Sequence, residues 1–319
     1  MSSVLRASLS VLAVVLAVGN CPGQAPIPPG KTPEVIRVGY SGGLFPTVSR
    51  KDIQVAVELW AKQMTADLGR PVSPKILFYD DLQSLLASLA AGNLDVASMT
   101  SVEYLASANR PPLEPFVVGT VNGRTEEEYV LLTHQSRTGI SLSDLRGRKL
   151  IVEGGRQGNP LMLIWLEALL LRDGLGTIDA FFGGVEKADK TSQAVMAVFF
   201  GRADACLVTR RLYATAVELN PQLGKDLVLL VQSPGLLSGV VCFPASVAEC
   251  KREIMEDGIF AMSTNPKGRQ ILTIFGLDGF APYEPVHLEA TRRLVREHTE
   301  RARLLDGGGS EAIGSDDRD

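Results

Sequence analysis

Four short polar segments, each placed directly after a strand-like run, carry the side chains best suited to hold a small ligand. They are Ser41-Gly42-Gly43, Thr100-Ser101, Gly154 to Asn159 and Glu186 to Thr191. In a parallel sheet, ligands bind beyond the carboxyl ends of the strands, where helix N-termini present free N–H groups. Such amides, together with hydroxyl or amide side chains, suit a carboxylate, a sulfonate or a phosphate. Each segment alone fits an ordinary cap or turn better than a ligand site, so the prediction of a site rests on their joint placement.

The candidate ligand-binding residues are polar side chains in or beside these segments. Arg156 or Lys187 would supply positive charge, and the other residues would supply hydrogen bonds and helix caps. The full set is Ser41, Thr100, Ser101, Arg156, Gln157, Asn159, Lys187 and Thr209. The acidic run Glu126-Glu127-Glu128 is interpreted as a solvated approach to a strand.

Signatures of catalysis and of cofactor binding are missing from the sequence. It contains neither G-x-S-x-G nor H-E-x-x-H, and no histidine lies in a candidate segment. Gly154-Gly155-x-x-Gly158 does not match the dinucleotide-binding pattern G-x-G-x-x-G. The histidines and cysteines do not have the spacing of a metal site. We therefore expect a binding protein rather than an enzyme, with no metal and no cofactor.

Length and composition fit two folded domains. The chain has 319 residues, of which 45% are hydrophobic and 21% are charged, enough for two domains that each bury a core. The hydrophobic fraction excludes an intrinsically disordered protein. A net charge of −4 without a basic run argues against a nucleic-acid partner, which needs a concentrated positive surface.

The N-terminal segment, residues 1–25, is predicted to be a secretion signal. Arg6 precedes an uncharged apolar run from Ala7 to Val18, and cleavage is expected near Ala25. Lipid attachment through Cys21 is the less favoured alternative. Residues 26–33 are predicted to form a proline-rich linker. Cys242 and Cys250 could form a disulfide after export, but the sequence does not fix the distance between them.

Strand-like and helical patterns alternate along the rest of the chain. Strands are expected at 35–40, 75–79, 95–99, 129–133, 149–152 and 203–208. Helices are expected at 52–68, 82–91, 160–174, 191–200 and 211–219, and after a capping box formed by Ser246 and Glu249. This alternation predicts an α/β protein with mainly parallel sheets flanked by helices. Residues 305–319 are expected to be a disordered acidic tail.

An ordered set of short stretches resembles one family of transport proteins. Gly92 to Ala97 is similar to its G-x-x-D-V-A pattern, and Gly201 to Ala205 is similar to its G-x-v-D-A pattern. Further matches are Tyr129 to Thr133 with Ile140 to Lys149, then Ser233-Pro234, and then Gly276 to Phe280. Over Val35 to Arg296 the chain thus resembles the periplasmic substrate-binding proteins of ABC transporters, in the phosphate/phosphite/phosphonate-binding group.

The resemblance implies a two-lobed, type II periplasmic-binding clamp. Lobe one would comprise 34–125 and 238–296, and lobe two 126–237. The protein would be a periplasmic monomer that captures a small, anionic ligand between its lobes and delivers it to an ABC permease. The alternatives are a ligand sensor for a membrane kinase and, less favoured, an enzyme on the same fold. Residues 155–159 and 184–189 lack the hydroxyl side chains of the family's phosphonate-binding loops, so the ligand stays unidentified.

Overall fold

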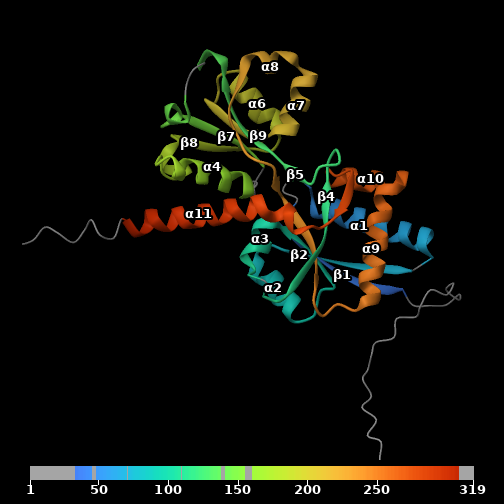
Figure 1. Cartoon of the computed structure of the whole chain (residues 1–319). Coiled ribbons are helices and arrows are strands. Elements are labelled where there is room, and N and C mark those ends of the chain that lie inside the picture. The colour runs from blue at the N-terminus through green and yellow to red at the C-terminus, as the bar shows by residue number, and fades with distance from the viewer. Residues whose placement is uncertain are drawn as a thin grey trace, which may run out of the picture.

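The computed structural model describes residues 33–44, 48–69, 71–108, 110–137, 141–154 and 160–308. The predicted signal peptide and the candidates Arg156, Gln157 and Asn159 lie outside these residues. The described chain forms two lobes, each built around one β-sheet with helices on both faces (Figure 1). This arrangement confirms the predicted α/β class.

Lobe one contains a six-stranded sheet in the order β13-β4-β12-β3-β1-β2. Its strands are β1 (Glu34–Ser41), β2 (Val72–Tyr79), β3 (Val96–Thr100), β4 (Leu113–Thr120), β12 (Gly239–Pro244) and β13 (Gly279–Pro282). One face is covered by α1 (Arg50–Leu68), α9 (Glu249–Thr264) and α10 (Pro266–Ile274). The other face is covered by α2 (Leu82–Ala90), α3 (Ser101–Ala106) and the 3-10 turn η3 (Pro285–Leu288).

Lobe two contains a five-stranded sheet in the order β10-β6-β9-β7-β8. Its strands are β6 (Tyr129–His134), β7 (Lys149–Glu153), β8 (Gly184–Ala188), β9 (Ala205–Thr209) and β10 (Leu227–Gln232). The 3-10 turn η2 (Leu142–Leu145), α4 (Pro160–Arg172) and α5 (Ile178–Phe181) pack on one face. The other face packs against α6 (Thr191–Phe199), α7 (Arg210–Leu219) and α8 (Pro221–Asp226), and the short turn η1 (Gln135–Arg137) follows β6.

Two chain crossings join the lobes, and they pair with each other. Strand β5 (Glu126–Glu127) leaves lobe one, and β11 (Leu236–Leu237) returns to it. The two strands are antiparallel, with Leu236 opposite Glu127 and Leu237 opposite Glu126. Residues more than a hundred positions apart in sequence thus form one ribbon between the lobes.

The C-terminal helix α11 (Glu289–Gly308) packs against both lobes (Figure 1). Leu294 enters the lobe-two core beside α4, and the ring of His298 lies 2.8 Å from the Glu167 carboxylate of α4. On the lobe-one side, the hydroxyl of Thr291 accepts a hydrogen bond of 2.9 Å from the backbone N–H of Leu237. The predicted tail boundary is therefore too early, because residues 305–308 are helical.

Local sequence signals account for many of the element boundaries. Helix α1 starts after Ser49, whose side chain accepts from the backbone N–H of Asp52, and ends at Gly69, which has a φ of 62°. The capping box predicted at Ser246 is wrong: the N-cap of α9 is Ala248, without a side-chain hydrogen bond. Both sheets are mixed rather than mainly parallel, because β12 and β6 pair antiparallel with their neighbours.

Two cysteines lie in the cores as free thiols. Cys206 and Cys242 are fully buried, so Cys242 does not form the disulfide with Cys250 that the sequence left open. Burial raises the pKa of both thiols, which keeps them protonated and unreactive. None of the described helices is both long and apolar enough to cross a membrane.

Candidate functional site

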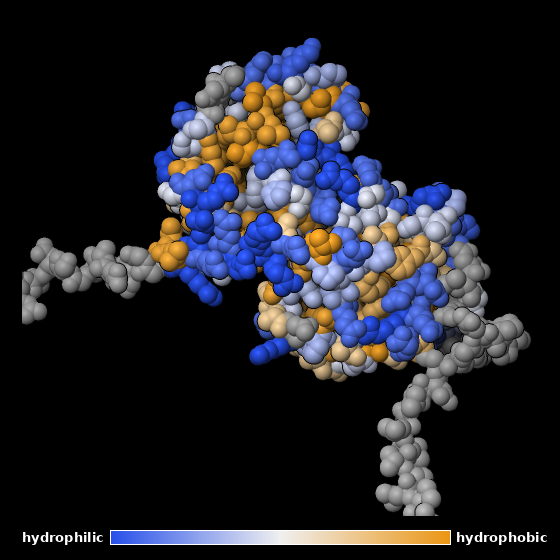
Figure 2. Space-filling model, viewed as in Figure 1, coloured by the Kyte–Doolittle hydropathy of each residue, from blue (hydrophilic) through white to orange (hydrophobic). Residues whose placement is uncertain are grey.

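A cavity of about 790 Å³ lies where the two lobes meet and is lined by both of them. Lobe one contributes the ends of β1, β3 and β12, and lobe two contributes the end of β7 and the first turns of α4 and α7. A band of hydrophilic residues crosses the molecule at this level on the face shown in Figure 2. Small-molecule sites in proteins range from about 300 to 1,000 Å³, so the volume suits a small ligand.

At the lobe-one wall, Glu103 occupies the two hydroxyls that the sequence proposes as ligand donors. Ser41 Oγ donates to the Glu103 carboxylate at 2.6 Å, and Thr100 Oγ1 donates to it at 2.8 Å. The backbone N–H of Glu103 donates in turn to Thr100 Oγ1 at 3.2 Å, which completes a capping box at the start of α3. These hydroxyls therefore hold the first turn of α3 in place.

At the lobe-two wall, Glu153 takes an equivalent position at the end of β7. Its carboxylate accepts a 2.9 Å hydrogen bond from the backbone N–H of Thr209, and the hydroxyls of Thr191 and Thr209 also donate to it. Burial raises the pKa of Glu153 above its usual value, more strongly than these hydrogen bonds lower it. Each lobe thus places a carboxylate on the strand-end donors that an oxyanion would otherwise use.

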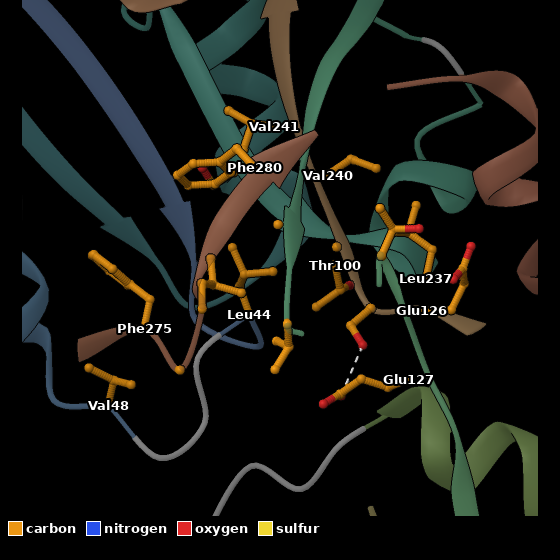
Figure 3. Close-up of a pocket in the computed structure, with 18 of the residues that line it drawn as sticks. Leu44, Val48, Thr100, Glu126, Glu127, Leu237, Val240, Val241, Phe275 and Phe280 are labelled. Atoms are coloured by element: carbon orange, nitrogen blue, oxygen red, sulfur yellow. Dashed lines mark hydrogen bonds between the residues drawn. The ribbon is translucent and has the colours of Figure 1, made fainter. Parts of the chain in front are cut away.

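Charged side chains from the first crossing and from α7 complete the polar part of the cavity. Glu128 pairs with Arg210 at 2.8 Å and with Arg124 at 3.7 Å. Glu127 accepts a hydrogen bond of 3.3 Å from Ser238, drawn as the dashed line in Figure 3, and lies 3.6 Å from a terminal nitrogen of Arg211. The Nε of Arg211 is buried and has no hydrogen-bond partner within the described part of the chain. Arg211, whose side chain lines the cavity, therefore carries one buried donor that no described residue uses.

The structure places the predicted site residues in different environments. Thr100 and Thr209 line the cavity, and Ser41 lies behind Gly43, whose backbone N–H donates to its hydroxyl at 3.2 Å. Ser101 is fully buried, and its hydroxyl donates to the carbonyl of Leu237, so it fixes α3 to the returning crossing. Lys187 is exposed on the edge strand β8, which covers the first half of the polar segment Glu186 to Thr191, and it does not line the cavity. Arg156, Gln157 and Asn159 lie outside the described residues.

The strongest chemical features of the cavity are residues that the sequence analysis did not select. Glu153 is the last residue of the strand β7, and Arg211 follows β9 by two positions. The rule that favours residues just after strands would have found both. Glu126 and Glu127 line the cavity instead of forming a solvated approach, because β5 pairs with β11 between the lobes. Among the described residues, no cluster of His, Cys, Asp and Glu could hold a metal ion.

Comparisons with solved structures identify the same two-lobed fold in several binding proteins. A Xanthomonas citri protein bound to ATP is 17% identical, with a TM-score of 0.58 over 86% of this chain and 98% of the other. A binding-protein component of a phosphonate ABC transporter from Pseudomonas aeruginosa is 14% identical, with a TM-score of 0.56 over 88% and 100% of the two chains. A Prochlorococcus marinus protein in complex with methylphosphonate is 15% identical, with a TM-score of 0.57 over 83% and 98%. At these identities the likeness establishes the fold alone.

The family assignment comes from the sequence. No curated protein matches the chain. The profile of one family, described as ABC transporter, phosphonate, periplasmic substrate-binding protein, matches residues 43–288, well over half of the chain. Members of this family are substrate-binding components of transporters and not enzymes, and membership implies a periplasmic location. The chain therefore belongs to the family of periplasmic substrate-binding proteins of phosphonate ABC transporters.

Proposed function

We propose that this protein is an exported monomer that captures a small anionic molecule in the cavity between its lobes and delivers it to an ABC permease. The negative charge of the ligand is inferred from Arg211, which lines the cavity and whose buried Nε has no hydrogen-bond partner among the described residues. A guanidinium can donate two parallel hydrogen bonds to an oxyanion, and such charge-assisted bonds are about twice as strong as neutral ones. The sequence had assigned this role to Arg156 or Lys187.

The carboxylates around Arg211 restrict the charge of that anion. Glu127 lies 3.6 Å from Arg211, and Glu153 also lines the cavity without an ion pair to any described residue. Both carboxylates repel an anion, and the repulsion grows with its charge, so a singly charged anion is disfavoured less than a dianion beside the guanidinium. The arrangement supports a singly charged phosphonate ester, sulfonate or carboxylate over doubly charged phosphate.

Isothermal titration with two neighbouring arginine variants tests this assignment. The probes are methylphosphonate, phosphate, methanesulfonate and acetate, applied to the wild-type protein, Arg211→Gln and Arg210→Gln. We expect Arg211→Gln to weaken binding of the best probe at least tenfold, a free-energy difference of about 1.4 kcal/mol. Arg210→Gln is the matched control, because its guanidinium is already paired with Glu128 at 2.8 Å. Equal affinities in wild type and Arg211→Gln would contradict the role of Arg211.

The genes beside this one test delivery to a transporter. Neighbouring genes for a permease and an ATPase would support transport. A neighbouring gene for a membrane histidine kinase would instead support the sensing function that the sequence leaves as the alternative.

A further inference from the structure

The cavity does not end at the polar residues but continues into the interior of lobe one. There it lies between the sheet and the helices α1, α9 and α10, and we call this part the apolar chamber. Its walls are formed by Val57, Val241, Ile259, Met262, Phe275 and Phe280, together with further apolar residues of the same elements. Figure 3 shows Phe275, Phe280 and Val241 to one side of Leu44 and the carboxylates of Glu126 and Glu127 to the other. One continuous space thus has a charged end and an apolar end.

Three side chains that line the apolar chamber are only partly buried, although others, such as Ile259 and Met262, are buried. Val241 lies on β12, an interior strand of the sheet, and helices cover this face. Even so, Val241, Tyr40 and Phe280 are each only partly buried. On the opposite face of the same sheet, Val118 is fully buried. The helices α1, α9 and α10 therefore close over part of this face, where Val117 and Phe243 are fully buried, and leave a gap beside Val241.

Few polar groups in the chamber could hold water. The indole N–H of Trp60 is already bound to the carbonyl of Gly258 at 3.0 Å. The Tyr40 side chain is partly buried, and its removal from water raises the pKa of the phenol. An apolar wall offers water few of the two to four polar partners that a buried water needs, which favours an apolar ligand there. Apolar surface without a packing partner lowers stability, and a ligand that fills the space restores the lost contacts.

We propose that the apolar chamber holds the hydrocarbon tail of an amphipathic ligand whose singly charged anionic head group binds Arg211. The assignment rests on the proposed solute-binding function and specifies its substrate class. Arg211 belongs to α7 of lobe two and the chamber belongs to lobe one, so such a ligand would contact both lobes at once. Its tail gains affinity in proportion to the apolar area that it removes from water.

Tryptophan fluorescence tests where the tail binds. The chain has two tryptophans, Trp60 in the wall of the chamber and Trp165 in the closed core of lobe two. The probe is 8-bromooctanoate, whose terminal bromine quenches an indole that it touches. In Trp165→Phe, Trp60 is the sole reporter, and we expect strong, saturable quenching. In Trp60→Phe, Trp165 is the sole reporter, and we expect almost none.

The outcomes separate this inference from the proposed function. Binding of 8-bromooctanoate that shifts the melting temperature without quenching Trp60, or that quenches both tryptophans equally, would overturn the chamber assignment and leave solute binding intact. Failure of the probe to bind would also overturn it. Failure of every anion, short or long, to bind would instead count against the proposed function. Octylamine binding in place of octanoate would retain the chamber but reverse the charge of the head group.

A pair of valine substitutions gives an independent test. Val241→Phe adds volume inside the chamber, and Val118→Phe adds the same volume on the packed face of the same sheet. We expect Val241→Phe to leave the melting temperature nearly unchanged and to abolish the preference for octanoate over acetate. Val118→Phe should lower the melting temperature by several degrees. Equal destabilisation by both substitutions, with the octanoate preference retained, would show that the chamber is not the binding space.

Discussion

The two lobes use the same plan, a sheet with helices on both faces, but they fill their cores differently. In lobe two the central strands β6 and β9 are buried almost throughout, with Leu131 and Leu207 fully inaccessible. In lobe one, β12 and β13 leave Val241 and Phe280 partly accessible to the cavity. The comparison shows that lobe two has a closed core and contributes Arg211 and Glu153 to the cavity, whereas lobe one has space for a ligand.

The largest expected difference between the lobes concerns truncation of a leucine. Leu131→Ala removes a fully buried side chain from the closed core of lobe two, and we expect a loss of about 2–5 kcal/mol in the free energy of unfolding. Leu277 lines the cavity and is only partly buried, so Leu277→Ala should cost about 1 kcal/mol. Urea denaturation measures both. A loss for Leu277→Ala as large as that for Leu131→Ala would show that the lobe-one core is packed as tightly.

The next largest effect concerns two carboxylates, one that is paired with basic side chains and one that has no ion pair to a described residue. Asp95 in lobe one is buried and paired with Arg37 at 2.7 Å and Lys251 at 3.0 Å. Burial alone would raise the pKa of Asp95, but the hydrogen bonds from Arg37 and Lys251 outweigh it, so this pKa is lowered. The stability that Asp95 contributes is thus present above its usual pKa of 3.8 and is lost as the pH falls through the lower folded value. Asp95→Asn should cost about 2 kcal/mol at pH 7, and the loss should disappear in acid.

Glu153 in lobe two should behave in the opposite way. Its pKa is raised above 4.5, so its contribution to stability is fully present below pH 4.5 and is lost as the pH rises through the folded value. Relative to wild type, Glu153→Gln should therefore gain stability between pH 4.5 and neutrality. Melting temperatures of Asp95→Asn and Glu153→Gln, measured from about pH 3 to about pH 8 and compared at about pH 4 and about pH 7, test this difference. Parallel pH profiles for the two variants would refute the assigned difference in their surroundings.

The smallest expected effect comes from truncating two buried threonines that precede helices. Thr100 caps α3 through its side chain, so Thr100→Ala should cost about 1 kcal/mol. Thr209 precedes α7 without a side-chain cap, and its hydroxyl bonds to Glu153 instead. Thr209→Ala should therefore cost less than Thr100→Ala in acid, where Glu153 is protonated, and more as the pH rises. A cost for Thr209→Ala that is independent of pH would contradict its link to Glu153.

The sequence predicts those features that depend on neighbouring residues. The strand at β3, the cap at Thr100 and the helix that ends at Gly69 all follow from patterns within a few positions. The bond between Ser41 and Glu103 joins residues 62 positions apart, so no local pattern reveals that this hydroxyl is occupied. The position of Glu126 and Glu127 likewise depends on pairing with β11, more than a hundred residues later.

The apolar chamber lies beyond sequence reasoning for a different reason. Val57, Trp60 and Met64 of α1 follow the helical spacing of a core-facing stripe. The same stripe would be found whether the helix packed closely on the sheet or stood away from it. Periodicity identifies which face is turned inward, but the packing of side chains from distant elements decides whether the interior is full.

The C-terminal helix has a consequence for how tightly a ligand can be held. Helix α11 is anchored to lobe two through Leu294 and His298 and to the lobe junction through Thr291, so it adds a third connection beside the two crossings. Three connections leave the empty protein fewer relative orientations of its lobes than two would. Less orientational entropy is then lost when a ligand binds, and a larger share of the contact energy remains as affinity.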